Sequence, residues 1–216
     1  MKNYKYIFFD LDGTITDPGE GITNSVAHSL KYYGIEVADK RELYTFIGPP
    51  LYASYMKYYG FSRDEAHRAV ERYREYYADK GVFECTLYPG IERLLRRLAE
   101  SDKRVVLATS KPEIFANKIL RHFGLEPCFD LVAGATLDSS RVEKSDVIKY
   151  ALDSLGITCA DEVLMIGDRE HDVLGAAAFN IDALGVTFGY GSRAELEAAG
   201  AKYILEGVED IENLLF

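Results

Sequence analysis

The strongest constraint on the fold is an alternation of strand-like and helix-like segments that begins at Tyr88 and runs to the end of the chain. Short apolar runs alternate with segments whose apolar residues recur at helical spacing. Such an alternation is typical of a parallel sheet that is covered by helices on both faces. Strands are expected at residues 5–9, 104–109, 131–133, 163–167, 183–187 and 202–205. The pattern predicts an α/β, Rossmann-like fold.

The segment from Pro18 to Phe83 interrupts this alternation. It contains helical patterns, no convincing strand and most of the 16 tyrosines of the chain. We therefore expect a core domain formed by residues 1–17 and 84–216, with an all-helical cap domain at residues 18–83 inserted into it. The tyrosines could either pack between helices or line a substrate cavity.

Charge and cysteine content limit the partners and the compartment. The formal net charge is −10, and no run of Lys and Arg forms a basic surface, which argues against a nucleic acid polymer or an acidic membrane as partner. Cys85, Cys128 and Cys159 are far apart, as expected of reduced thiols. The apolar run Met1–Phe9 is too short for a signal peptide. We expect a soluble cytoplasmic protein.

Two acidic residues follow the first predicted strand directly. Asp10 ends an apolar run, and Asp12 comes two residues later, before Gly13. In an open parallel sheet, ligands bind beyond the carboxyl ends of the strands. Two acids this close repel each other and require a cation, hydrogen bonds or different protonation states. A strand-ending turn with solvated acids is the structural alternative for this motif taken alone.

Further polar residues lie at other predicted strand ends or helix starts. Thr109 and Ser110 end a second strand, Asp168 ends a third, Asp172 follows one helical turn later, and Lys144 begins a helix. Hydroxyl and ammonium groups can hold phosphate oxygens, and carboxylates are ligands for Mg²⁺. A carboxylate can also attack phosphorus as a nucleophile. Together these residues predict a phosphate and Mg²⁺ site at one edge of the sheet.

These motifs resemble those of the haloacid dehalogenase superfamily, in the branch with a helical cap after the first motif. The four motifs are carried by Asp10-Leu11-Asp12-Gly13-Thr14, by Thr109, by Lys144 and by Gly167–Asp172. Within that branch the sequence is most similar to phosphoglycolate phosphatases and to 5′-nucleotidase-like relatives. Gly48-Pro49-Pro50-Leu51 and Thr109-Ser110-Lys111-Pro112 carry this finer similarity. Ser110 stands where those phosphatases often have asparagine, which leaves the substrate open.

The resemblance implies a role for each residue. Asp10 would be the nucleophile, and Asp12 the general acid and base. Asp10, the main-chain carbonyl of Asp12 and Asp168 would bind Mg²⁺, with Asp172 behind them. The phosphoryl group would be held by Thr109, Ser110 and Lys144.

The implied activity is hydrolysis of a small phosphorylated metabolite, phosphoglycolate or a nucleoside 5′-monophosphate, by a monomer or homodimer. We expect the cap turn Gly48, Pro49, Pro50 and Leu51 to select the leaving group, unless its prolines only separate two helices.

Three other functions use similar residues. A dehalogenase has no use for a second acid such as Asp12, whereas a phosphomutase would keep every motif. A non-enzymatic phospho-receiver would place its acid pair before the phosphorylated aspartate. A protein that only binds phosphate would lack Asp10 or Asp12. Gly189-Tyr190-Gly191-Ser192-Arg193-Ala194 matches a dinucleotide-binding pattern, but it comes late in the chain, and Ser192 with Glu195 predicts a helix capping box there.

Overall fold

The computed structural model describes residues 2–138 and 140–216, so Met1 of the predicted core segment lies outside the described residues. The chain forms two compact units. We call the first the core unit; it runs up to Thr16 and resumes over Leu87–Phe216. The second, Asp17–Thr86, is called the helical unit. Two short paired strands, β2 (Thr16–Asp17) and β3 (Thr86–Leu87), lie where the chain passes from one unit to the other.

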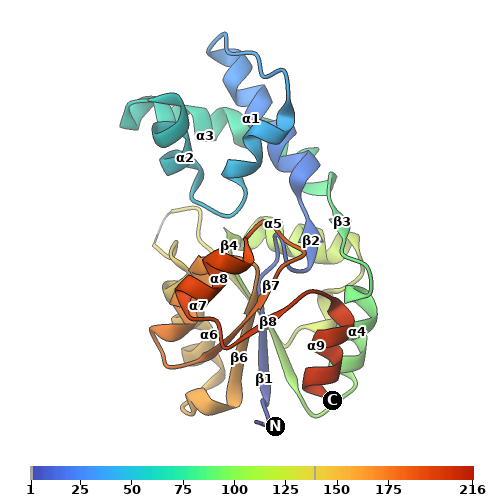
Figure 1. Cartoon of the computed structure of the whole chain (residues 1–216). Coiled ribbons are helices and arrows are strands. Elements are labelled where there is room, and N and C mark those ends of the chain that lie inside the picture. The colour runs from blue at the N-terminus through green and yellow to red at the C-terminus, as the bar shows by residue number, and fades with distance from the viewer. Residues whose placement is uncertain (1, 139) are drawn as a thin grey trace. The chain divides into compact units, whose positions relative to one another are not determined.

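The core unit is built on a six-stranded sheet with the strand order β5-β4-β1-β6-β7-β8 (Figure 1). Every neighbouring pair of strands is parallel, as the sequence pattern predicts. The strands are β1 (Tyr6–Phe9), β4 (Arg104–Pro112), β5 (Leu131–Ala135), β6 (Val163–Gly167), β7 (Asp182–Val186) and β8 (Tyr203–Leu205).

The strand order places a topological switch point at β1. From β1 the chain continues to β4 and β5 on one side, and then returns to β6, β7 and β8 on the other side. In open α/β sheets, ligands bind beyond the carboxyl ends of the strands at such a point. Residues that follow β1, β4 and β6 therefore meet at the expected position of a site.

Helices cover both faces of the sheet, because each carries one apolar stripe that must be buried. In α4, for example, Ile91, Leu94, Leu95 and Leu98 are buried, whereas its arginines are exposed. α4 contacts α9 on one face, whereas α6 contacts α7, and α7 contacts α8 (Figure 1). The helices are α4 (Ile91–Ala99), α5 (Glu113–His122), α6 (Lys144–Leu155), α7 (Glu170–Ala177), α8 (Arg193–Ala199) and α9 (Val208–Leu215).

The central strands are almost fully buried. Ile7, Phe8 and Phe9 of β1 are inaccessible to solvent, and all five residues of β6 are buried. Phe8 packs with Val147 and Ile148 of α6 in one continuous apolar cluster. Burial of each large apolar side chain contributes roughly 1.5–3 kcal/mol. This packing fixes the strand ends from which the polar residues project.

The helical unit consists of α1 (Gly19–Tyr32), α2 (Leu51–Tyr59) and α3 (Arg63–Tyr77), with a 3₁₀ helix at Lys40–Phe46. Its tyrosines divide between two environments. Tyr55, Tyr73 and Tyr77 are buried between helices, whereas Tyr32 and Tyr52 are exposed. Among the described residues, no helix has the length and apolar character that crossing a membrane requires.

Two local details differ from the sequence-based expectation. The strand predicted at residues 104–109 extends to Pro112, which aligns with Ala135 of β5 and directly precedes α5. At α8, the Ser192 hydroxyl accepts a hydrogen bond from the Glu195 N–H. The Glu195 carboxylate does not complete the predicted capping box, because it accepts from Arg169 and from the Glu170 N–H instead.

Candidate active site

Asp10 stands at the carboxyl end of the central strand. Its N–H donates to the carbonyl of Ile166 in β6 at 2.9 Å, which continues the pairing of the two strands. The chain then turns sharply, because the N–H groups of Ile15 and Thr16 both donate to the Leu11 carbonyl at 2.9 Å. This turn holds Asp10 and the following residues at the edge of the sheet.

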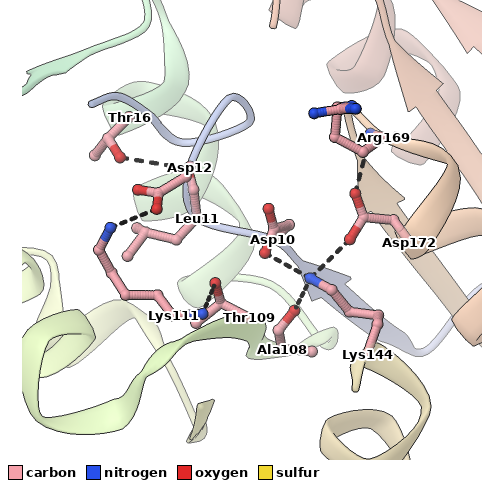
Figure 2. Close-up of polar contacts among 10 residues, drawn as sticks. All are labelled: Asp10, Leu11, Asp12, Thr16, Ala108, Thr109, Lys111, Lys144, Arg169 and Asp172. Carbon is pink, nitrogen blue, oxygen red and sulfur yellow. Dashed lines mark hydrogen bonds and ion pairs between the residues drawn. The ribbon is translucent and has the colours of Figure 1, made fainter. Parts of the chain in front are cut away.

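Lys144 at the start of α6 reaches this edge from the side (Figure 2). Its ammonium donates to Asp10 Oδ1 at 2.6 Å and to the Ala108 carbonyl at 2.9 Å. It also forms an ion pair of 2.7 Å with Asp172 Oδ1. Burial alone would lower the pKa of Lys144, but Asp10 and Asp172 outweigh it and raise that pKa. Lys144 is therefore a buried cation that holds the predicted nucleophile.

Asp168 lies in a cradle of main-chain atoms at the end of β6. Its Oδ2 accepts from the Tyr190 N–H at 2.7 Å, whereas Oδ1 is buried and makes no hydrogen bond to the described residues. A Cβ on Gly13 would lie 2.1 Å from Oδ2, and one on Gly191 would lie 1.9 Å from the Asp168 carbonyl oxygen. Burial first, and then Asp172 and Asp10, raise the pKa of Asp168 well above its usual value.

Three of these acids could together hold a metal ion. One carboxylate oxygen from each of Asp10, Asp168 and Asp172 lies within 4.8 Å of the others, and all three residues are buried. With the partly buried Asp12, the described site holds four carboxyl groups but two lysines, the buried Lys111 and Lys144. The carboxylates exceed the lysines by two, and one Asp168 oxygen has no hydrogen-bond partner among the described residues. A divalent cation that prefers oxygen ligands, such as Mg²⁺, would balance these charges and bind that oxygen.

The end of β4 contributes hydroxyl groups beside Asp10. Thr109 is 2% exposed, and its Oγ1 accepts from the Lys111 N–H at 3.2 Å. An oxygen that already accepts this bond can still donate its own hydrogen to an anion. Ser110 follows at a partly buried position. Both hydroxyls therefore come from the strand that lies next to β1.

Asp12 does not join the three acids that could hold a metal. Its carboxylate pairs through Oδ2 with the ammonium of Lys111, and its Oδ1 is buried without a hydrogen-bond partner among the described residues (Figure 2). Burial raises the pKa of Asp12, and the charge of Lys111 opposes that effect. Asp10 and Asp12 therefore lie in different environments although they are two residues apart.

The structure thus brings most of the predicted site residues to one edge of the core unit. Gly48, Pro49, Pro50 and Leu51 belong to the helical unit, where the first three lie between the 3₁₀ helix and α2 and Leu51 is the first residue of α2. That unit also contains a cavity of about 380 Å³ whose lining includes Asn24, Lys40 and Tyr44 but none of these four residues.

Two contributors to the site were not identified from the sequence. Lys111 was noted only as part of a similar tetrapeptide, and Tyr190 only as part of a dinucleotide-like pattern. That pattern has a different basis here, since Gly189 and Gly191 allow the backbone to approach Asp168 closely. Asp10 and Asp168 can be found from the sequence because each follows an apolar run that predicts a strand. The contacts of Lys111 and Tyr190 depend on how segments that are distant along the chain meet in the fold.

Comparison with known proteins agrees with this geometry. Residues 7–186 match the family model described as haloacid dehalogenase-like hydrolase. The chain is 45% identical over 195 residues to a 5′-nucleotidase of Pseudomonas aeruginosa, covering 90% of this chain and 88% of that protein. It is 31% identical over 221 residues to a phosphoglycolate phosphatase of Rhodospirillum rubrum, covering 98% and 90%. The crystal structure of a predicted phosphatase from Clostridium acetobutylicum matches with a TM-score of 0.94 at 47% identity, covering 99% of this chain and 98% of that one.

Proposed function

We propose that this chain, which belongs to the haloacid dehalogenase-like hydrolase family and is a phosphatase, hydrolyses small phosphomonoesters by a covalent mechanism with Asp10 as nucleophile. One observation carries the proposal. Asp10 lies at the switch point of the sheet with one oxygen held by Lys144, while Asp12, two residues away, is held separately by Lys111. Two carboxyl groups in different environments can take the different roles of nucleophile and acid.

In the first half of the reaction, a carboxylate oxygen of Asp10 attacks the phosphorus of the substrate. The bond between phosphorus and the leaving oxygen breaks, and the Asp12 carboxyl gives its proton to that oxygen. Lys144 and the Thr109 hydroxyl hold oxygens of the transferring phosphoryl group, and Ser110 assists them. The products of this half are a free alcohol and an aspartyl-phosphate at Asp10.

In the second half, a water molecule attacks the phosphorus of the aspartyl-phosphate. Asp12, now a carboxylate, takes the proton from this water, and the bond between phosphorus and the Asp10 oxygen breaks. Inorganic phosphate leaves, and both aspartates return to their initial state. The same residue is thus acid in one half and base in the other.

We infer that the metal is Mg²⁺, held by Asp10, the main-chain carbonyl of Asp12 and Asp168. When bound, it neutralises negative charge that develops on the phosphoryl oxygens. Asp172 stands behind these groups, with Oδ1 against Lys144 and Oδ2 accepting from the Arg169 N–H at 3.1 Å. Its role is to hold the lysine and the acidic cluster in place.

The substrate is proposed to be phosphoglycolate or a nucleoside 5′-monophosphate. The proteins whose names include these activities are similar to the chain over most of its length. The turn Gly48-Pro49-Pro50-Leu51 is proposed to select the leaving group, since two successive prolines make a rigid edge.

A panel of phosphate esters with Mg²⁺ tests this proposal. The panel contains phosphoglycolate, nucleoside 5′-monophosphates, sugar phosphates and an aryl phosphate, and released phosphate is measured. Asp10→Asn should lower turnover of every ester at least about 10³-fold, because it removes the nucleophile. Asp153→Asn is the matched control, because Asp153 is an exposed acid paired with Lys149. Retention of more than about a tenth of the activity by Asp10→Asn would contradict the covalent mechanism.

A further inference from the structure

Lys111 is a buried lysine whose ammonium faces the general acid of the proposed mechanism. Its side chain is 5% exposed, and its ammonium pairs with Asp12 Oδ2 across 99 residues of sequence (Figure 2). Burial of an ammonium group is unfavourable unless a well-placed partner compensates for it. The other buried lysine, Lys144, pairs with Asp10 and Asp172, so that each lysine serves a different aspartate of the pair Asp10 and Asp12.

A break in the sheet brings Lys111 to this position. The β4 strand advances three residues, from Thr109 to Pro112, while β5 advances only from Gly134 to Ala135. Ser110 and Lys111 therefore have no counterparts on β5. Such irregularities disrupt the ladder and redirect side chains, and they are common beside active sites. Gly134 permits this one, because a Cβ there would lie 2.8 Å from the Lys111 carbonyl oxygen.

The main chain of Lys111 contacts a second residue of the site. Its N–H donates to Thr109 Oγ1 at 3.2 Å. Thr109 is the hydroxyl residue assigned to the phosphoryl group, whereas Asp12 is assigned to the leaving oxygen. Lys111 is thus connected to the groups on both sides of the bond that breaks.

We propose that Lys111 is a positioning residue for Asp12, a role that rests on the proposed function of this site. Its ammonium holds Oδ2 and leaves Oδ1 as the oxygen that exchanges the proton. When Asp12 gives its proton to the leaving oxygen, the carboxylate that remains is stabilised by the adjacent ammonium. Lys111 itself gains and loses no proton and forms no covalent bond in either half of the reaction.

The leaving group provides the test. Esters of acidic alcohols need little proton donation, whereas esters of weakly acidic alcohols depend on it. In single-turnover measurements of the phosphorylation step, Lys111→Met should slow aryl and alkyl phosphates with poor leaving groups by about 10–100-fold. It should change a dinitrophenyl phosphate by less than about 3-fold. Lys111→Arg should recover most of the loss, because a guanidinium can still hold the carboxylate.

Two comparisons separate positioning from a structural role. In the Asp12→Asn background, Lys111→Met should slow the step by less than about 2-fold, since the two residues act as a unit. Lys149→Met is the matched control, because Lys149 forms an exposed ion pair with Asp153. If Lys111→Met does not fold, Lys111→Gln replaces it: the amide can fill the site and donate to Asp12 but lacks the charge, so the same dependence on the leaving group should appear with a smaller loss.

Three results would overturn the proposal. An equal loss for all leaving groups would make Lys111 structural. A higher KM for carboxylate-bearing esters with unchanged kcat would make it a substrate-binding residue. No loss for any ester would remove it from the site. All three results are read on a wild-type chain whose phosphatase activity requires Asp10. If that activity is absent, the result contradicts the proposed function of the site rather than the role of Lys111.

Discussion

The amino ends and the carboxyl ends of the strands, here called the amino edge and the carboxyl edge of the sheet, both hold aspartates paired with lysines, but they differ in how fully the acids are compensated. At the amino edge, Asp182 Oδ2 accepts from Lys2 at 2.7 Å, from Lys202 at 2.7 Å and from the Tyr4 hydroxyl at 2.8 Å. Burial would raise the pKa of Asp182, but these donors outweigh it and hold that pKa at about 2. The amino edge therefore has ample donors for its acid.

At the carboxyl edge, acids outnumber cations. Asp168 and Asp12 each keep one buried oxygen without a hydrogen-bond partner among the described residues. Burial is the first cause that raises the pKa of both, and cations compensate only in part. The amino edge thus stabilises the fold. The carboxyl edge keeps uncompensated acids, which could bind a divalent cation and react with a phosphate ester. Variants at the two edges should therefore have opposite effects.

Asp168→Asn should have the larger effect. We expect phosphate release to fall by about 10²–10⁴-fold, because the variant removes a charged ligand of the proposed metal. At saturating Mg²⁺, near 100 times Kd, the wild type should gain about 2.7 kcal/mol. That gain corresponds to roughly 5–10 °C in Tm for a chain of this size, whereas the variant should gain much less.

Thermal melts in EDTA complete this test. Without metal, Asp168→Asn should melt at the same temperature as the wild type or higher, because a buried acid that lacks a second partner has been neutralised. A clear fall in the metal-free Tm, with the Mg²⁺ response intact, would show that Asp168 has the same structural role as Asp182.

Asp182→Asn should affect stability alone. Its folded pKa of about 2 lies below the ordinary aspartate pKa of 3.8. The stabilisation is therefore present above pH 4 and is lost as the pH falls towards 2. At pH 7 the variant should lose about 2 kcal/mol of unfolding free energy and keep its kcat. Urea titrations from pH 7 to pH 2 measure this, and a pH-independent loss or a reduced kcat would contradict it.

The sequence predicted the residues that local signals mark. Asp10, Thr109 and Asp168 each follow an apolar run, so their meeting at one edge follows from a parallel sheet, and Lys144 starts a helix beside them. The ion pair of Lys111 with Asp12 was missed because it depends on a two-residue irregularity in β4.

Two further contacts could not be read from sequence for a similar reason. The Tyr190 N–H reaches Asp168 across 22 residues, through a turn whose glycines were assigned no contact. The Glu195 carboxylate leaves its own helix cap because Arg169 offers a charged donor at 2.8 Å. Periodicity and turn patterns describe neighbours along the chain, whereas these contacts join segments that only the fold brings together.

Phosphoryl trapping at Asp10 tests the central claim most directly. The Asp12→Asn variant should form the covalent intermediate from an ester with a good leaving group but hydrolyse it slowly, because it lacks the base. After acid quench, mass spectrometry of its peptides should find one added phosphoryl group on Asp10, removable by hydroxylamine and absent when Asp10 is also replaced by Asn. A phosphoryl group on another residue, or turnover with none on Asp10 at any quench time, would contradict the account.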